Sequence, residues 1–177
     1  MHKYFKENII KILYTTAKIE KRIKVLAAQI TNDYANKDLI VVSVLRGSIM
    51  FVSELIKNID LPLELDFIWV KSYAQTESTG KVKLLKKPDS KLAGRDVLLV
   101  DDILDTGYTF SRTIEILKEY SPRSIRTAAL LNKPARRKLN IKLDYCGFEI
   151  GNEFVVGYGM DFQQKYRNLP FLGVMKI

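Results

Sequence analysis

The order of apolar and polar residues predicts a chain of alternating helices and strands. Between residues 17 and 34, apolar side chains recur at every third or fourth position, which is the period of a helix with one buried face. Residues 39–45 are almost wholly apolar and rich in β-branched side chains, as in a strand covered on both faces. Further strands are expected over residues 63–70, 97–100, 125–131, 144–150 and 154–158.

Two more helices follow strands in this pattern. Ser48 is expected to cap a helix over residues 51–56, and a second helix follows residue 109 and ends at the Ser-Pro pair 121–122. Strands that alternate with helices predict an α/β fold with a mostly parallel, helix-covered sheet, whose ligand site lies beyond the carboxyl ends of the strands. Residues 72–81 are polar and lack a period, so they predict a mobile loop before a return strand over residues 81–85.

The composition excludes several kinds of catalytic site. The sequence contains one histidine, His2, and one cysteine, Cys146. A Ser-His-Asp triad, a Cys-His pair or a zinc site with nitrogen and sulfur ligands therefore lacks its material. Catalysis must rest on carboxylates, lysines, arginines, hydroxyls and oxygen-bound metals. A single cysteine cannot form an internal disulfide, which suits a reducing compartment and favours the cytoplasm.

Charge narrows the class of partner. The chain has 29 basic and 20 acidic residues, and a net charge of +9 favours nucleic acid, a membrane surface or a phosphorylated small molecule as partner. Charged residues interrupt the apolar positions of residues 1–22, unlike the centre of a signal peptide, and no stretch approaches the roughly 20 apolar residues of a membrane-spanning helix. We therefore expect a soluble protein that is not exported and has no membrane partner.

Residues 97–110 carry the strongest chemical signal. Four apolar residues lead to Asp101 and Asp102, which can orient a polyhydroxylated sugar or hold Mg²⁺ through oxygen ligands. Residues 105–109, Asp-Thr-Gly-Tyr-Thr, then precede a helix whose free N–H groups can bind phosphate. Either half alone is better explained as a strand end or a helix cap, but their combination favours the functional interpretation. The sequence contains neither a Walker loop nor a G-x-G-x-x-G motif after a strand.

This segment resembles the phosphoribosyl-diphosphate (PRPP) signature of the type I phosphoribosyltransferases. Residues 45–48, Leu-Arg-Gly-Ser, resemble the diphosphate-binding loop of that family, and residues 72–80 resemble the mobile loop of its purine branch. Lys133 stands where the hypoxanthine-guanine enzymes carry their base-reading lysine. Residues 153–161, with Tyr166 and Arg167, resemble their C-terminal hood. The resemblance runs from about residue 15 to the end of the sequence and points to the hypoxanthine-guanine branch.

Two positions depart from the family pattern. Members often have Glu-Asp where this sequence has Asp101 and Asp102, and some have Lys where Tyr108 stands. The first difference keeps the charge. The second, Tyr108 in place of Lys, removes a charged side chain near a phosphate that backbone N–H groups mainly bind. Neither difference therefore undermines the assignment.

The resemblance implies a fold and a reaction. The fold is that of the type I phosphoribosyltransferases: one domain over residues 1–177, with a mobile loop at about 72–83 and a small C-terminal hood at about 150–177. The reaction transfers the 5-phosphoribosyl group from PRPP to hypoxanthine or guanine, with Mg²⁺ as cofactor, and gives IMP or GMP and diphosphate. Because members of this family usually form dimers or tetramers, a homodimer or homotetramer is expected.

The resemblance also assigns roles to residues. The PRPP phosphate and sugar are expected to bind at Asp101, Asp102, Asp105, Thr106, Gly107, Tyr108 and Thr109. The diphosphate group is expected at Arg46, Gly47 and Arg167, with a cis peptide between Leu45 and Arg46. The purine is expected at Lys133, Phe154, Val155 and Asp161, and Mg²⁺ at Asp101, Asp102 and Asp161. Asp105 is the expected general acid/base near N7 of the purine, while Ser72 and Tyr73 would close the mobile loop.

Each role has a plainer alternative. Without the resemblance, Lys133 belongs to a solvated basic run, residues 133–138, while Phe154 and Val155 are core residues of a strand. For Arg167 an exposed charge and a diphosphate ligand are about equally supported, and for Asp105 the rival role is a helix cap.

Two other functions remain open at the level of sequence. One is a PRPP-sensing regulator that binds RNA or DNA on the same scaffold, with residues 81–95 and 133–142 as a basic stripe. The absence of an added DNA-binding domain and the presence of Lys133 and the hood disfavour nucleic acid as a partner. The other is an enzyme that prefers xanthine, which differs from guanine only at C2, whereas Lys133 disfavours adenine.

Overall fold

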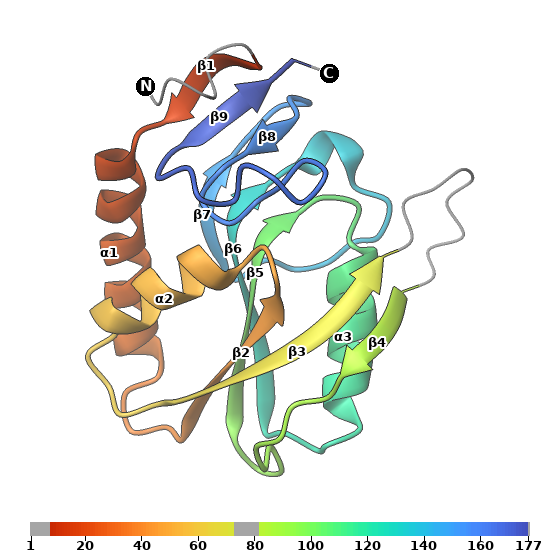
Figure 1. Cartoon of the computed structure of the whole chain (residues 1–177). Helices are drawn as coiled ribbons and strands as arrows, with labels where there is room; N and C mark the ends of the chain where they lie inside the picture. Colours follow the sequence, from red (N-terminus) through yellow and green to blue (C-terminus); the bar gives the residue numbers. More distant parts are fainter. Residues whose placement is uncertain (1–7, 73–81, 177) are drawn as a thin grey trace.

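The computed structural model describes residues 8–72 and 82–176, which form two β-sheets and three α-helices (Figure 1). The larger sheet has the strand order β4-β3-β2-β5-β6-β7 and the smaller sheet has the order β1-β9-β8. The helices are α1 (Thr16–Asp33), α2 (Ile49–Asn58) and α3 (Tyr108–Lys118). The strands are β1 (Ile9–Tyr14), β2 (Leu39–Leu45), β3 (Glu64–Ser72), β4 (Val82–Lys86), β5 (Asp96–Leu104), β6 (Ser124–Asn132), β7 (Tyr145–Glu149), β8 (Val155–Val156) and β9 (Leu172–Met175).

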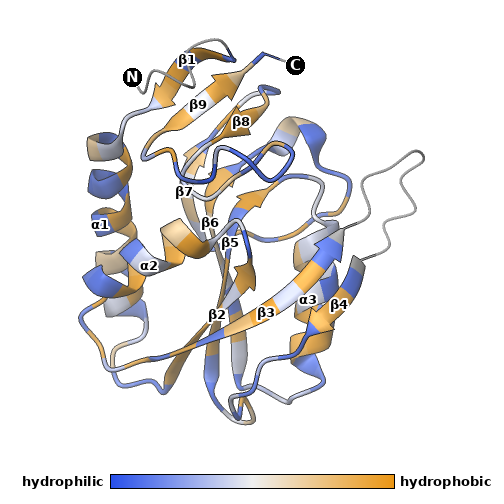
Figure 2. Ribbon diagram, in the orientation of Figure 1, coloured by the Kyte–Doolittle hydropathy of each residue, from blue (hydrophilic) through white to orange (hydrophobic). Residues whose placement is uncertain are grey.

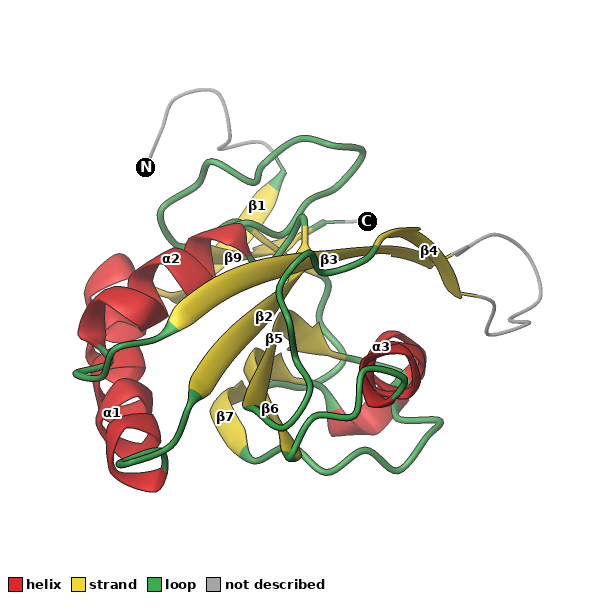
Figure 3. Ribbon diagram, turned by 90° about the horizontal axis from the view of Figure 1, so that it is seen from below, coloured by secondary structure: helices red, strands yellow, loops and turns green. Residues whose placement is uncertain are grey.

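Helices cover both faces of the larger sheet, with α1 and α2 on one side and α3 on the other (Figure 3). Strands β2, β3, β5, β6 and β7 pair in parallel, and only β4 is antiparallel to its neighbour. The central strands are strongly hydrophobic, whereas the helices show hydrophilic outer surfaces (Figure 2). The predicted α/β fold with a mostly parallel, helix-covered sheet is therefore confirmed.

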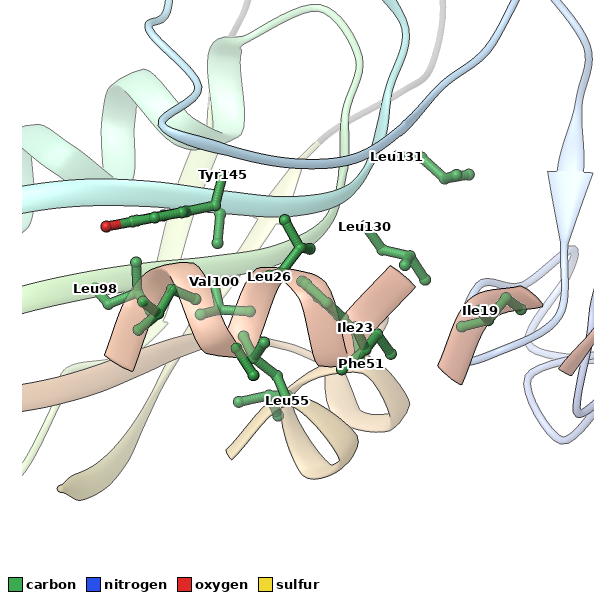
Figure 4. Packing of buried hydrophobic residues seen from close by; sticks show 14 of the residues in the cluster. Ile19, Ile23, Leu26, Phe51, Leu55, Leu98, Val100, Leu130, Leu131 and Tyr145 are labelled. Atoms are coloured by element: carbon green, nitrogen blue, oxygen red, sulfur yellow. The ribbon is translucent and has the colours of Figure 1, made fainter. Parts of the chain in front are cut away.

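The period of two along the central strands divides the core into two layers. In β5, Leu98 and Val100 pack under α1 and α2, while Val97 and Leu99 pack under α3. Figure 4 shows the first layer, in which side chains of α1 and α2 meet those of the sheet: Ile19, Ile23, Leu26, Phe51, Leu55, Leu98, Val100, Leu130, Leu131 and Tyr145. The buried face of α1 is the stripe that its sequence period predicts, at positions 19, 23, 26, 27 and 30.

The smaller sheet joins segments from opposite ends of the chain. Strand β1 pairs antiparallel with β9, with Ile9 opposite Met175, and β9 continues to β8. The sequence pattern predicted neither β1 nor β9. Both strands are short, and β1 acquires its partner only from the far end of the chain, which a local pattern cannot indicate. The predicted C-terminal hood is thus completed by an N-terminal strand.

Several element boundaries and one helix cap differ from the prediction. Strand β5 continues to Leu104 rather than ending at residue 100, because β6 runs alongside it to Asn132. Helix α3 ends at Lys118 rather than at residue 121, since Ser121 adopts a positive φ of 53° and turns the chain away. Ser48 is the N-cap residue of α2 as predicted, but it makes no side-chain cap, and its hydroxyl donates to the carbonyl oxygen of Val44.

In the part of the chain that the structure describes, no helix combines the length and the apolar character needed to cross a membrane.

Candidate active site

The candidate site lies where the parallel strands of the larger sheet end. The register pairs Ser43 of β2 with Val100 of β5, and Leu104 of β5 with Asn132 of β6. The segments that follow these strands therefore meet at one edge of the sheet, where the C-terminal hood also contacts them. They contain most of the residues that the sequence assigned to binding and catalysis.

Asp101 and Asp102 occupy the last part of β5, inside the strand rather than after it. Asp101 is 6% exposed, and its Oδ1 accepts a hydrogen bond of 2.9 Å from the backbone N–H of Asp102. Burial raises the pKa of Asp101 well above its ordinary value, and the negative charge of Asp102 raises it further. Burial also raises the pKa of Asp102, although the nearby Arg167 guanidinium opposes this shift. Asp102, which is less buried, is the acid better placed for an external ligand.

The segment after β5 leaves the start of α3 free for an anion. Gly107 is the N-cap residue of α3 with a φ of +96°, and no side chain caps the first turn. A Cβ at this position would lie 3.0 Å from the carbonyl oxygen of Leu139, so both the backbone angle and the space favour glycine. Neither Asp105 nor Thr109 takes the helix-capping role that was their plainer interpretation. The backbone N–H groups and the helix dipole remain available for a phosphate.

The carboxyl group of Asp105 is held beside this segment with one oxygen lacking a hydrogen bond. Its Oδ1 is buried and accepts none among the described residues, and the Arg136 Nε lies 3.5 Å away. A buried oxygen without a partner is uncommon and costs free energy unless a ligand or water satisfies it. This arrangement suits a carboxylate that exchanges a proton with a bound molecule.

Arg137 fixes the backbone on which Asp105 stands. Its guanidinium donates to the carbonyl oxygens of Asp105 at 2.9 Å and Leu104 at 3.0 Å, and to Oδ1 of Asn132 at 2.6 Å. The sequence pattern places Arg137 only in a basic run, residues 133–138. Its place after a Lys-Pro turn was the one available signal, and it was too weak to single this arginine out from its neighbours.

Lys133 is buried, which removes its alternative role as a solvated surface charge. It is 4% exposed, and its Nζ donates to the carbonyl oxygen of Glu153 at 2.8 Å. Its backbone N–H donates to the carbonyl oxygen of Leu104 at 3.0 Å. Burial lowers the pKa of Lys133, and the charge of Asp105 opposes that shift. The lysine thus links the end of β5 to the hood, with one ammonium hydrogen-bond donor satisfied by protein and two available.

The hood residues predicted to contact a purine lie around β8. Phe154 is partly exposed and meets Phe162 edge-to-face, with ring centroids 5.7 Å apart. Val155 is buried in β8 and belongs to the main core, so its side chain is a packing residue. Asp161 accepts a hydrogen bond from the backbone N–H of Gln164 and forms an ion pair of 2.6 Å with Arg167.

The predicted diphosphate loop is held between β5 and the hood. The peptide bond between Leu45 and Arg46 is cis, as the family resemblance implied. Gly47 has no room for a side chain, since a Cβ there would lie 1.9 Å from Oδ2 of Asp102. A Cβ on Gly159, whose φ is +99°, would lie 2.0 Å from the carbonyl oxygen of Gly47. The side chain of Asp102 and the backbone of Gly159 thus both approach this loop closely.

Two arginines border the same loop. Arg167 donates to the carbonyl oxygen of Gly159 at 2.8 Å and to Oε1 of Gln164 at 3.2 Å. The same Gln164 oxygen accepts a 3.5 Å hydrogen bond from Arg46. The guanidinium groups of Arg46 and Arg167 therefore flank one glutamine, and together they provide positive charge beside the loop.

The predicted closing residues fall at the edge of the described chain. Ser72 is the last residue of β3, and Tyr73 lies outside the described residues, as does most of the predicted mobile loop. The return strand is found as β4, at Val82–Lys86.

The donor set fits a magnesium ion that keeps other ligands. Across residues 8–72 and 82–176, no group of three or more His, Cys, Asp or Glu side chains could hold a metal ion by itself. Mg²⁺ prefers oxygen ligands and is often held by one or two carboxylates together with water and substrate phosphates. The carboxylates of Asp102 and Asp161, both near Arg167, match this pattern, whereas Asp101 is only 6% exposed and therefore less accessible to an ion.

Comparison with known proteins agrees with the site. Residues 10–163 match the phosphoribosyl transferase domain model. The hypoxanthine-guanine phosphoribosyltransferase of Bacillus subtilis is 43% identical over 97% of this chain and 96% of its own length. That of Staphylococcus aureus is 45% identical over 99% of this chain and 97% of its own length.

Solved structures agree as well. A crystal structure of a Staphylococcus aureus hypoxanthine phosphoribosyltransferase matches with a TM-score of 0.95 and 44% identity, covering 99% of this chain and 96% of the other. A hypoxanthine-guanine-xanthine phosphoribosyltransferase matches with a TM-score of 0.87 and 35% identity, covering 97% and 99%. The chain therefore belongs to the phosphoribosyltransferase family and, within it, to the hypoxanthine-guanine phosphoribosyltransferases.

Proposed function

We propose that this enzyme transfers the 5-phosphoribosyl group of PRPP to N9 of hypoxanthine or guanine, a purine salvage reaction that gives IMP or GMP and diphosphate. The observation that carries the proposal is the buried position of Lys133. Its ammonium group donates to the carbonyl oxygen of Glu153 in the hood, and its backbone N–H donates to Leu104, the residue before Asp105. Lys133, the donor to a purine oxygen, and Asp105, the carboxylate for a purine proton, are thus linked through the hydrogen bond between the backbone of Lys133 and Leu104.

The 5-phosphate of PRPP would bind at the start of α3. The uncapped N–H groups after Gly107 and the dipole of the helix favour a dianion, and the hydroxyls of Thr106 and Thr109 would add donors. Tyr108 would contribute its backbone N–H. Asp102 would accept hydrogen bonds from the ribose hydroxyls, with Asp101 behind it as a buried support.

The diphosphate group would bind at the loop that follows β2. The backbone N–H groups of Arg46 and Gly47 and the guanidinium groups of Arg46 and Arg167 would stabilise its negative charge as it leaves. Mg²⁺, held by Asp102 and Asp161 together with substrate oxygens, would supply further neutralisation of that charge. The cis peptide lies at this loop, and Gly47 allows the loop to approach Asp102 closely.

The base would lie between the hood and β6. Lys133 would donate to O6 of the purine, Phe154 would stack on its ring, and the backbone carbonyls of Val155 and Asp161 would read its far edge. As the bond between N9 and the anomeric carbon forms and the bond to diphosphate breaks, Asp105 would accept the proton from N7. Closure of the loop by Ser72 and Tyr73 would exclude water, which otherwise hydrolyses PRPP.

Xanthine is the second candidate base. It presents the same O6 acceptor to Lys133 as guanine does, and one structural relative at 35% identity is named for use of all three bases. Adenine is disfavoured because its 6-amino group would present a donor to the lysine.

An ultraviolet assay with PRPP and Mg²⁺ tests the proposal when hypoxanthine, guanine, xanthine, adenine and uracil are offered separately. We expect turnover of hypoxanthine or guanine that is lost when a chelator is added. Faster turnover of xanthine than of hypoxanthine or guanine would identify xanthine as the preferred base instead. No turnover of any base, together with retained PRPP binding and salt-dependent binding of RNA or DNA, would support the regulator instead.

We further infer that the enzyme works in the cytoplasm as a homodimer or homotetramer. Ile49 and Met50, directly after the diphosphate loop, are each 41% exposed, which supports a covering partner at this position. Light scattering coupled to gel filtration measures the mass of the particle, and a monomer at micromolar concentration would contradict this assembly.

A further inference from the structure

Trp69 lies where β3 passes the proposed diphosphate loop. The parallel pairing of β2 and β3 ends with Leu45 opposite Trp69, immediately before the peptide bond that leads to Arg46. From there the side chain of Arg46 extends over the indole ring, with its Cζ 4.8 Å from the ring centroid. This separation lies within the range of a cation–π contact, for which tryptophan is the strongest aromatic partner.

The indole ring is the main contact that orients the Arg46 guanidinium. Arg46 is exposed and forms no ion pair with any carboxylate among residues 8–72 and 82–176. Its other side-chain contact is the long hydrogen bond of 3.5 Å to Oε1 of Gln164. An exposed arginine without such a contact samples many rotamers, and ordering it on binding costs conformational entropy.

Stacking leaves the edge of the guanidinium free for an anion. The group is planar, and its N–H donors point outward in the plane of the group, so a ring that contacts one face leaves those donors free. Arg46 can therefore remain on the indole while it donates to a diphosphate oxygen. A positive charge that is already oriented binds a dianionic group more tightly than a mobile one.

We propose that Trp69 is a positioning residue that holds the Arg46 side chain toward the diphosphate group. This inference rests on the proposed function, because it assumes that diphosphate binds at the loop after β2. Neither the sequence motifs nor the resemblance of the hood gives Trp69 a role. Trp69 is also the single tryptophan of the sequence, so its fluorescence reports on this contact without competing signals.

The test measures binding of inorganic diphosphate with Mg²⁺ by calorimetry, and KM for PRPP by the ultraviolet assay. Trp69→Leu removes the ring face and is expected to raise the dissociation constant of diphosphate about three- to thirtyfold, with kcat and the KM of the base changed much less. Trp69→Phe retains an aromatic face and should recover most of the affinity. In the wild type, tryptophan fluorescence should change on addition of diphosphate.

A double-mutant cycle separates positioning from a general structural effect. In an Arg46→Met background the guanidinium is absent, so Trp69→Leu should cause no further loss of diphosphate affinity. Phe67→Leu is the matched control, since it makes the same kind of change two residues earlier in β3, where the ring packs against the main core. It should leave diphosphate affinity unchanged.

The outcomes distinguish this inference from the proposed function. Unchanged diphosphate affinity in Trp69→Leu, or an equal further loss in the Arg46→Met background, would overturn the role of Trp69 even if the enzyme turns over hypoxanthine. Failure of the wild type to use any base, with the coupling between Trp69 and Arg46 intact, would instead overturn the proposed reaction. Thermal unfolding of each variant identifies any that fails to fold, and Trp69→Phe then carries the test.

Discussion

At the scale of single residues, the chemistry depends on charged groups whose burial the sequence does not reveal. Oδ1 of Asp105 is buried and has no hydrogen-bond partner among the described residues, and the buried Lys133 donates its backbone N–H to the carbonyl oxygen of Leu104, the residue before Asp105. The family resemblance predicted that Asp105 and Lys133 were functional, whereas without it Lys133 belonged to a solvated basic run. The sequence could not predict a role for Arg137. Its three hydrogen bonds, to the carbonyl oxygens of Asp105 and Leu104 and to Oδ1 of Asn132, form only after residues 132–137 fold against the end of β5.

Replacement of Asp105 tests the acid/base role. Asp105→Asn keeps the shape of the side chain but cannot accept a proton at the reacting purine, so kcat is expected to fall about 10²- to 10⁴-fold. The affinity for PRPP should change little, because the proposed phosphate site consists of N–H groups of α3. Steady-state kinetics and PRPP binding by calorimetry provide the two values. An equal loss of turnover and PRPP affinity would assign Asp105 to substrate binding rather than to proton transfer.

Replacement of Lys133 tests the reading of the base. Lys133→Gln exchanges a charged donor for a neutral amide, and a charge-assisted hydrogen bond contributes roughly 1.5–3 kcal/mol. We therefore expect kcat/KM for hypoxanthine to fall about 10- to 150-fold. The amide oxygen can accept from the 6-amino group of adenine, so the ratio of adenine use to hypoxanthine use should rise. If the ratio stays constant while both activities fall, Lys133 supports the fold of the site and does not select the base.

At the scale of elements, local patterns predict what local contacts determine. The buried stripe of α1 and the whole of β2 follow from the sequence period, since each buries its apolar residues against the nearest layer. Strands β1 and β9 were not predicted, because the residues that pair in them lie near opposite ends of the chain. The true end of β5 likewise depends on β6.

The end of α1 provides a test at this scale that depends on pH. Asp33 accepts hydrogen bonds of 2.7 Å from both Arg126 and the Tyr145 hydroxyl, which ties α1 to β6 and β7. The hydrogen bond from Tyr145 and the charge of Arg126 lower the pKa of Asp33 below its ordinary value. A carboxyl with a lowered pKa in the folded state adds stability above its unfolded pKa, near 3.9, and that stability is lost as pH falls through the folded value.

Asp33→Asn should therefore reduce the free energy of unfolding by about 1 kcal/mol at pH 7, a small value because the side chain is half exposed. The difference from the wild type should shrink between about pH 4 and pH 2. Urea unfolding at several pH values measures it. A difference that is the same at pH 7 and pH 3 would show that the charge of Asp33 is not what ties the helix to the sheet.

At the scale of the whole molecule, the proposed mechanism requires the hood to be held against the diphosphate loop of the larger sheet. Gly159 of the hood and Gly47 of the diphosphate loop approach so closely that a single added carbon on Gly159 would lie 2.0 Å from the Gly47 carbonyl oxygen. Arg167 holds the same turn through the carbonyl oxygen of Gly159. Close contacts between backbones at this turn therefore help to set the distance between the proposed base site and the proposed diphosphate site.

Gly159→Ala should therefore weaken PRPP binding by more than its loss of folding stability alone explains. Gly94→Ala is the matched control, because Gly94 also has a positive φ, of +74°, but no atom lies within 4 Å of its added Cβ. Both variants carry the backbone cost of about 1–2 kcal/mol for a left-handed residue. Only Gly159→Ala also displaces Gly47, so its PRPP affinity should fall at least about tenfold while that of Gly94→Ala stays at the wild-type value. If calorimetry finds both affinities unchanged, the diphosphate site tolerates movement of the hood, and the two sheets need not be fixed relative to each other for PRPP to bind.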